Sequence, residues 1–217
     1  MISTFVNRHI KQCVPDSKEG PVVTHHNVAL KLSSLSFLSD TTARILKLVN
    51  NEIERLQTMD EAGAKKNSVP AIMVMTVDTM NVVEMHKELI NKYGNAAAME
   101  GKYDVRIHKL FARHIKPQEQ ADQLCRTHPS FKTRQCLNVY VGTPNRLAKL
   151  SEMKAFFMDK GDILKMVILD CRLNKKEMSL FEDKESQKDV MQVLAFGKDR
   201  WTSSKKDEDK RLKLCLV

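Results

Sequence analysis

Two patterns of hydrophobic residues alternate along the chain. One is a short run of hydrophobic residues, and the other is a segment with hydrophobic residues three or four positions apart, as on one face of a helix. Runs of this length predict strands, and those at 71–77 and 165–169 are nearly continuous, which suits a sheet that is covered on both faces. Amphipathic segments lie between them, and this alternation predicts a mostly parallel sheet with crossover helices. The predicted strands lie at 71–77, 105–111, 137–141, 165–169 and, as a last strand, 212–217.

Helix signals fill the segments between these strands. A first helix starts after a cap at Asp40 and ends near Gly63, with its apolar face at Ile45, Val49, Ile53 and Leu56. A second, over 79–93, follows a cap at Asp78, stops at Gly94 and is expected to bury Val82, Val83, His86, Leu89 and Ile90. Further helices are expected from Pro117, after Thr143, and over about 176–196 with Met191, Val193 and Leu194 inward.

The organisation of the chain changes near residue 39. Residues 1–38 have no clear period and contain several turn formers, so we interpret them as an N-terminal arm. Residues 39–217 hold the predicted helices and strands and are long enough for one domain with one main core. The first helix of this region, over about 40–63, precedes the sheet.

The composition is that of a folded protein with an excess of positive charge. Hydrophobic residues make up 42% of the 217, and the formal net charge of +9 favours polyanionic partners such as RNA. No apolar run approaches the length that spans a bilayer and the N-terminus lacks a signal-peptide core, so we expect a soluble, intracellular protein without a membrane partner. Five scattered cysteines without a C-x-x-C pair suggest reduced, mostly buried thiols.

The residues give no support for a nucleotide or catalytic site. A phosphate-binding loop needs closely spaced glycines between a strand and a helix, whereas Gly63–Ser68, the nearest imitation, follows a helix and precedes a strand. Asp170 ends a predicted strand, but Cys171 and Arg172 follow it, and a positive neighbour disfavours a metal. We therefore expect Asp170 to hydrogen-bond a loop, and we expect no cofactor, no ATP, no metal and no catalytic residue.

One turn carries a possible anion site. Thr143 suits the N-cap of a helix, Pro144 suits its first position, and Arg146 follows in the first turn beside free backbone N–H groups. These donors, the positive end of the helix dipole and a guanidinium can together hold a phosphate at the carboxyl end of a strand. The alternative is an ordinary capped helix, because any such helix has these features.

Several segments resemble a known family of RNA-associated proteins. VGTPNRL is similar to the TPGR-type motif of DEAD-box RNA helicases, MTVDTM takes the place of their PTRELA-type segment, and VILDCR takes the place of the strand that ends in DEAD. Three residues depart from the helicase pattern: Val77 stands where helicases carry an RNA-contacting Arg, Asn145 replaces the Gly of the TPGR-type motif, and Cys171 replaces the Glu of DEAD. KLFARHIKPQEQ and VILDCRLNKKEMSLFEDKESQKDVMQVL resemble the Cms-one ribosomal small-subunit family, a degenerate branch of this fold, over about residues 70–196.

The resemblance implies a three-layer RecA-like fold of the P-loop NTPase type in a nucleolar component of the small-subunit processome. Such a protein assists pre-rRNA processing as a pseudo-helicase that binds pre-ribosomal RNA and processome proteins, and not as an enzyme. Carried over by position, the RNA-binding residues are Gly142, Thr143 and Arg146, with a basic cluster of Lys109, Arg113, His114 and Lys116. The alternative for the cluster is a solvated strand end and helix start.

Two other functions remain open from the sequence. The first is a protein-interaction scaffold without direct RNA binding, which docks a partner through the arm or through apolar residues near Phe156–Phe157; the loss of the helicase arginine at Val77 favours it. The second is an ATPase with an unusual site at Asp170.

Overall fold

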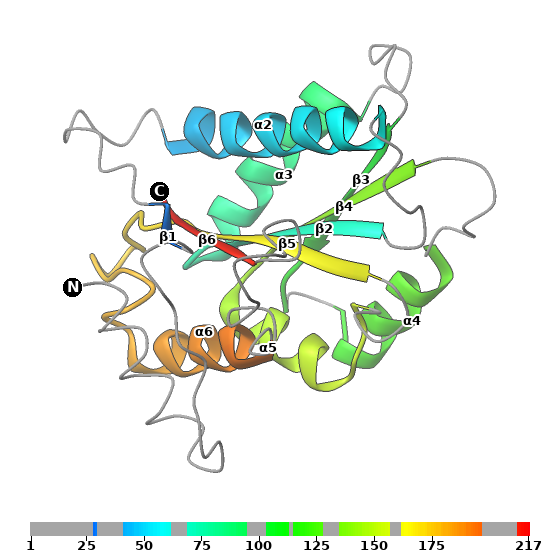
Figure 1. Ribbon diagram of the computed structural model, residues 1–217. Coiled ribbons are helices and arrows are strands. Elements are labelled where there is room, and N and C mark those ends of the chain that lie inside the picture. Colours follow the sequence, from blue (N-terminus) through cyan, green and yellow to red (C-terminus); the bar gives the residue numbers. More distant parts are fainter. Residues whose placement is uncertain are drawn as a thin grey trace, which may run out of the picture.

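The protein is built around a six-stranded sheet in which all strands run parallel, in the order β1-β6-β5-β2-β4-β3 (Figure 1). The computed structural model describes residues 28–29, 41–61, 69–94, 103–112, 115–127, 135–156, 162–196 and 212–217. The strands are β1 (Val28–Ala29), β2 (Val69–Met75), β3 (Tyr103–Leu110), β4 (Gln135–Gly142), β5 (Asp162–Leu169) and β6 (Lys213–Leu216).

Helices cover both faces of the sheet, which gives three layers. On one face lie α2 (Thr41–Glu61) and α3 (Thr79–Tyr93), and on the other lie α4 (Pro117–Thr127), α5 (Pro144–Glu152) and α6 (Lys184–Phe196) (Figure 1). The predicted fold class, a three-layer RecA-like α/β fold, is therefore confirmed. Strand β1 lies within residues 1–38, which the sequence predicted to be an arm. It pairs with β6, so this segment contributes one strand to the sheet.

Strand β2 lies in the middle of the sheet and is buried on both sides. Ala71, Met73 and Met75 pack into the core beneath α4, α5 and α6, and Ile72 and Val74 pack into the core beneath α2 and α3. All five side chains are 0% exposed. This position explains the continuous apolar run, because each large side chain here gains roughly 1.5–3 kcal/mol from burial.

Helix α3 buries a narrower stripe than predicted. Val83 and Ile90 are 39% and 40% exposed, and His86 is only half-buried. The buried residues are Val82, Met85, Leu89 and Tyr93. The prediction failed for Val83 and Ile90 because α3 packs on the sheet through one side only, which leaves the opposite side of the helix at the surface.

The long helix predicted over 176–196 is wrong in its first part. Residues 171–183 form turns, and α6 starts only at Lys184. The carbonyl oxygen of the Asn174 side chain accepts hydrogen bonds from the backbone N–H groups of Lys176 and Met178, at 2.8 and 3.1 Å, which folds this segment into a compact loop. Asp183 then caps α6, since its carboxylate accepts from the backbone N–H of Ser186 at 3.1 Å.

Two further expectations about exposure need correction. Phe156 is 1% exposed, and its ring packs against Tyr140 with centroids 4.8 Å apart, so it offers no docking surface. Cys215 is buried as expected, whereas Cys171 is exposed. Phe157, Arg113, His114, the side chain of Leu56 and the arm apart from 28–29 lie outside the described residues.

The five predicted strands are all present, but β1 was missed, and β2 to β5 begin earlier than predicted. The structure adds polar residues at the start of three strands, Tyr103 of β3, Gln135 of β4 and Asp162 of β5, because backbone pairing continues beyond the buried apolar run. The burial predicted for Met191, Val193 and Leu194 of α6 is confirmed.

Candidate functional site

The carboxyl ends of the central strands form one connected edge. The backbone N–H of Thr76 donates to the carbonyl of Gly142 at 3.1 Å, and that of Asp170 donates to the carbonyl of Met75 at 2.9 Å. The N–H of Thr143 donates to the carbonyl of Leu110 at 3.1 Å. These bonds continue the sheet into its loops and fix them relative to one another at the edge where open α/β sheets bind ligands.

Arg172 is the centre of a charged cluster at this edge. Its Nε and Nη2 lie 3.0 and 2.8 Å from Oδ2 of Asp170, a carboxylate that is fully buried. Its Nη1 lies 3.4 Å from Oε2 of Glu84 on α3 and 3.5 Å from Oγ1 of Thr42 on α2. One guanidinium therefore connects the end of β5 to both helices on that face of the sheet. We call Thr42, Glu84, Asp170 and Arg172 the Arg172 cluster.

The charges in the Arg172 cluster compensate one another. Burial alone acts to lower the pKa of Arg172, but the hydrogen bonds and charge of Asp170, followed by those of Glu84, raise this pKa above its ordinary value. Asp170 also accepts a hydrogen bond from the backbone N–H of Arg172 at 3.1 Å, which confirms the expectation that it bonds a loop. The guanidinium therefore stays charged and neutralises the buried carboxylate.

The Arg172 cluster does not fit a magnesium ion. In P-loop NTPases, magnesium is held by a hydroxyl at the start of the helix after the phosphate loop and by an aspartate at the end of a neighbouring strand. Thr42 and Asp170 have these two positions here, but the guanidinium of Arg172 contacts both of them. Within the described segments, no group of three His, Cys, Asp or Glu side chains is arranged to hold a metal.

Strand β1 is followed in the chain by helix α2, and a phosphate loop lies between a strand and a helix in this order. No glycine occurs between Ala29 and Thr41, although such loops need glycines so that backbone N–H groups can surround phosphate oxygens. The sequence pointed to Gly63–Ser68 as the nearest imitation, because β1 has only two residues and is too short to be recognised as a strand from its sequence. Pairing with β6 is what reveals this strand.

The turn before α5 is tightly packed. Thr143 is the N-cap of α5 in backbone conformation, yet its side chain makes no capping hydrogen bond. Pro144 follows at the first helical position, as predicted. A β-carbon at Gly142 would lie 2.5 Å from the carbonyl oxygen of Leu110 and 3.0 Å from Leu147, so the glycine lets β3, β4 and α5 approach one another.

Arg146 lies under the surface rather than on it. The side chain is 3% exposed, and Nη2 donates to the carbonyl oxygen of Ile115 at 2.7 Å. Nε and Nη1 are also buried, and neither has a hydrogen-bond partner among the residues that the structure describes. Burial lowers the pKa of Arg146. In this conformation the guanidinium holds the backbone at Ile115, just before α4.

Two of the predicted basic residues are exposed close to this turn. Lys109 lies at the end of β3, with Nζ 5.7 Å from the centre of the Phe111 ring, and Lys116 precedes α4. Their backbone neighbours, Leu110 and Ile115, are the residues that accept hydrogen bonds from Thr143 and Arg146. The structure therefore brings the backbone next to Lys109 and Lys116 to the turn, whereas the Lys109 side chain lies on the face of the sheet that α2 and α3 cover.

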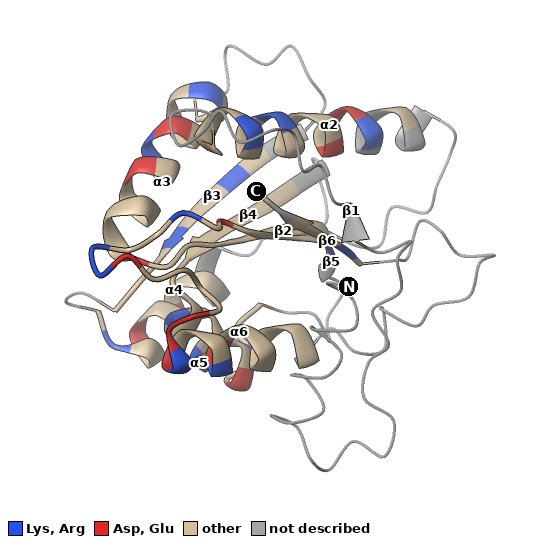
Figure 2. Cartoon of the chain, turned by 90° about the vertical axis from the view of Figure 1, so that its left-hand side faces the viewer, with Lys and Arg blue, Asp and Glu red and all other residues tan. Residues whose placement is uncertain are grey.

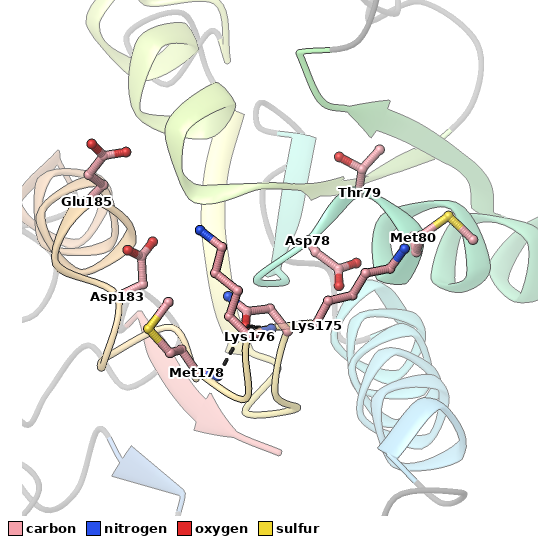
Figure 3. A pocket seen from close by; sticks show the side chains of 9 residues that line it. Asp78, Thr79, Met80, Lys175, Lys176, Met178, Asp183 and Glu185 are labelled. Atoms are coloured by element: carbon pink, nitrogen blue, oxygen red, sulfur yellow. Dashed lines mark hydrogen bonds between the residues drawn. The ribbon is translucent and has the colours of Figure 1, made fainter.

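Sequence reasoning missed a pocket of about 400 Å³ at the same edge of the molecule (Figure 3). The start of α3 forms one side of the pocket, and the loop after β5 and the approach to α6 form the others. The pocket was not expected because the sequence predicted a helix over 176–196, whereas residues 176–183 belong to this loop. The lining residues are Asp78, Thr79, Met80, Asn174, Lys175, Lys176, Met178, Asp183 and Glu185.

Charged residues of both signs are spread over the outer sides of the helices, while the central strands carry few (Figure 2). Among the described residues, positive charge is therefore not concentrated on one helix. Lys109, Lys116, Lys175 and Lys176 are exposed cations at the carboxyl edge. None of the described helices combines the length and apolar character that a membrane span requires.

A comparison with sequence models of protein families matches residues 34–216 to the model named CMS1, described as a U3-containing 90S pre-ribosomal complex subunit. The match covers most of the chain and includes every described residue of the Arg172 cluster and of the α5 turn. A search of curated proteins gives no match for this chain.

Proposed function

Because the chain belongs to the CMS1 family of U3-containing 90S pre-ribosomal complex subunits, we propose that it acts in the pre-ribosome without catalysis, by binding RNA along the carboxyl edge of its sheet. Membership gives the chain a role in ribosome biogenesis and confirms the family resemblance seen in the sequence. The absence of catalysis, the contact with RNA and a position in the nucleolus with other small-subunit processome proteins are the further content of the proposal.

The observation that carries the non-catalytic part is the position of Arg172. The guanidinium lies between Thr42 and Asp170, where a working P-loop NTPase holds magnesium, and it is bound to the buried carboxylate through two nitrogen atoms. Displacing it would leave an uncompensated buried charge, which is strongly unfavourable. The glycine-free connection from β1 to α2 supports the same conclusion, since it lacks the residues that surround phosphates.

RNA binding is supported by the grouping of cationic and N–H donors at one part of the carboxyl edge. Exposed Lys116 lies just before α4, beside the first turn of α5, whose free backbone N–H groups form the positive end of the helix dipole. Exposed Lys109 projects from the end of β3 on the other face of the sheet, with Phe111. Arg146 is assigned a positioning role, because its bond to Ile115 holds the backbone next to Lys116. This revises the direct phosphate contact that the sequence suggested for Arg146.

Salt titration of RNA binding tests this part of the proposal. The full chain is mixed with a labelled structured RNA, and affinity is measured by fluorescence anisotropy at increasing salt. Lys109→Ala and Lys116→Ala are each expected to reduce the salt slope by about one unit, because each removes one phosphate contact. Lys47→Ala, an exposed lysine of α2, is the matched control and should leave the slope unchanged.

The variant Arg146→Ala distinguishes between two alternative roles of the buried arginine, positioning of the backbone and direct contact with phosphate. If Arg146 positions the loop, affinity falls while the salt slope stays within a few tenths of the native value; a slope reduced by about one unit indicates a direct phosphate contact instead. If the lysine variants bind RNA like the native chain, the turn and its neighbours are not the RNA site. RNA binding weaker than micromolar at physiological salt would favour a protein-interaction scaffold.

An ATPase assay tests the non-catalytic part. We expect no hydrolysis above background with magnesium, in the presence or absence of RNA. Hydrolysis that is abolished by Asp170→Asn would overturn the proposal and support the atypical ATPase. Asp189→Asn, which changes an acid paired with Asn145 at 3.2 Å outside the Arg172 cluster, is the control for general effects of losing a carboxylate.

A further inference from the structure

Helix α3 exposes a stripe of apolar residues on the side that faces away from the sheet. Met80 is 62% exposed, Val83 39% and Ile90 40%, and the exposed side chain of Lys87 lies between the last two. Their spacing of three, four and three residues places the four on one side of the helix. We call Met80, Val83, Lys87 and Ile90 the α3 stripe.

Glu84 and His86 of α3 lie on either side of the α3 stripe, and their contacts show which neighbouring elements each side faces. Glu84 points toward α2 and the loop after β5, where it contacts Thr42 and Arg172. His86 is on the other side, close enough to Lys109 of β3 for that charge to contribute to its lowered pKa, after the larger effect of burial. The stripe between them is therefore the part of α3 that neither α2 nor the sheet covers.

The spacing of the stripe is that of the a and d positions of a heptad. This is the pattern by which one helix packs against another, with each side chain inserting between residues of the partner helix. Lys87 stands at an a-type position, where a single charged residue reduces nonspecific pairing and selects a partner of opposite charge. From Met80 to Ile90 the stripe is about 15 Å long, enough for about three turns of a partner helix.

The chemistry of the stripe decides among the possible occupants. RNA is disfavoured, because three of the four residues are apolar and the carboxylates of Glu84 and Glu88 lie on the same helix. A second copy of this chain is disfavoured as well, because the α3 stripe itself contains no carboxylate and Glu84 beside it already pairs with Thr42 and Arg172. A helix of another protein with an acidic residue facing Lys87 satisfies both the apolar and the charged positions.

We propose that the α3 stripe docks an amphipathic helix of a partner protein, which carries apolar residues at heptad spacing and an Asp or Glu opposite Lys87. The pocket at the start of α3 continues this surface, since Met80 belongs to both (Figure 3). Lys175, whose side chain extends toward Met80, adds a second cation at that end (Figure 3). The inference does not depend on RNA binding, and failure of the RNA test leaves it intact.

Site-specific crosslinking in cells identifies the occupant. The full chain carries a photoreactive phenylalanine analogue at Val83, and the crosslinked peptide is sequenced. The expected peptide comes from another protein and has apolar residues at heptad spacing together with an Asp or Glu. Crosslinks that lead only to RNA, to a second copy, to this chain itself or to nothing overturn the proposal.

A charge exchange with a synthetic peptide of the mapped segment gives the second test. Lys87→Glu is expected to weaken binding of the peptide to the full chain by about tenfold, and changing the facing acid of the peptide to Lys restores it. Met80→Asp is expected to weaken binding by at least as much, because it places a charge in an apolar contact. Circular dichroism confirms that each variant is folded.

Matched controls come from exposed residues on other helices. Lys47→Glu on α2 makes the same charge change, and Met153→Asp at the end of α5 introduces the same acid at a methionine that is 36% exposed. Both are expected to bind the peptide like the native chain. If Lys87→Glu binds like Lys47→Glu, or if the exchanged peptide does not restore affinity, the α3 stripe is not the docking surface.

Discussion

Gly142 was predicted as an RNA-binding residue, and at the scale of one residue its structural role is close packing. Its backbone lies against Leu110 and Leu147, and a methyl group there would meet a carbonyl oxygen at 2.5 Å. Gly142→Ala is therefore expected to lower the free energy of unfolding by about 1–3 kcal/mol, as other overpacked sites do. Urea unfolding followed by circular dichroism measures the change.

The adjacent residue provides the control for Gly142. Thr143 is the N-cap of α5 without a side-chain capping bond, so Thr143→Ala should cost only a few tenths of a kcal/mol, well below the roughly 1 kcal/mol typical of a bonded cap. A loss for Thr143→Ala as large as that for Gly142→Ala would show that the whole turn, and not the contact with Leu110, sets the stability.

His108 makes the stability of the sheet depend on pH. Burial lowers its pKa, and the charges of Arg106 and His86 add to this effect, while the hydrogen bond with Asn138 opposes it. The unfolded chain therefore binds the proton first, and the unfolding free energy is expected to fall as pH drops below 6.5. His108→Gln should reduce this fall, as measured by urea unfolding above and below that pH.

The contribution of His108 has a definite pH window. It is fully present above the unfolded pKa of 6.5 and is lost as pH falls toward the lower pKa of the folded state. Burial and the charge of Lys109 lower the pKa of His86 as well. His86→Gln is therefore the comparison, and it should remove a separate part of the loss of unfolding free energy at low pH. An unfolding free energy that rises on acidification would contradict both assignments.

Some contacts of the candidate site could be predicted from residue types, and others could not. The hydrogen bond of Asp170 to its loop followed from Cys171 and Arg172 beside it, and Pro144 followed from helix-start rules. The burial of Arg146 did not follow, because its partner is the backbone of Ile115, a contact across two elements that no local pattern encodes.

At the scale of elements, the loop between β5 and α6 gives the clearest test. Glu177 has a φ of 59°, a left-handed conformation that costs a residue with a side chain roughly 1–2 kcal/mol. Glu177→Gly is expected to raise the unfolding free energy by up to about 1 kcal/mol, after the greater flexibility of glycine in the unfolded chain is subtracted. Thermal unfolding followed by circular dichroism detects the shift.

Two comparisons check the origin of that gain. Lys154, at φ 53°, is the other described non-glycine residue in this conformation, and Lys154→Gly should stabilise by a similar amount. Glu177→Ala lacks the freedom of glycine and should not stabilise. A decrease in stability for Glu177→Gly would mean that the side chain has a role beyond the loop conformation.

Element types were predictable because the sheet is buried on both sides. Every apolar run became a strand, and each intervening segment contains a helix. The beginning of α6 was not predictable, because residues 176–183 have acceptable helix composition but Asn174 folds them through side-chain hydrogen bonds to Lys176 and Met178. The outward face of α3 was also missed, since apolar residues at helical spacing do not indicate which of them meet the core.

At the scale of the molecule, Arg172 connects the two helices of one layer to the sheet. Arg172→Ala leaves the fully buried Asp170 without its cation, and the expected loss of unfolding free energy is about 3–5 kcal/mol. The double change Asp170→Asn with Arg172→Leu should recover much of this loss, because no buried charge remains. Chemical denaturation of the single and double variants measures both.

Exposed ion pairs provide the reference for the Arg172 cluster. Glu84 is 55% exposed in its pairing with Arg172, so Glu84→Gln should cost less than about 1 kcal/mol. If Arg172→Ala costs no more than Glu84→Gln, the guanidinium does not compensate Asp170, and it does not block a magnesium ion at that position.

The overall topology has a consequence for the order in which the protein can form. β1 precedes every other described element in the chain, yet its only described neighbour in the sheet is β6, the last, with Val28 beside Leu214. During synthesis β1 has to wait until all five other strands have been made, whereas β2, β4 and β3 can pair much earlier. This edge therefore closes after the rest of the sheet, and it joins the two described strands that are most distant in the chain.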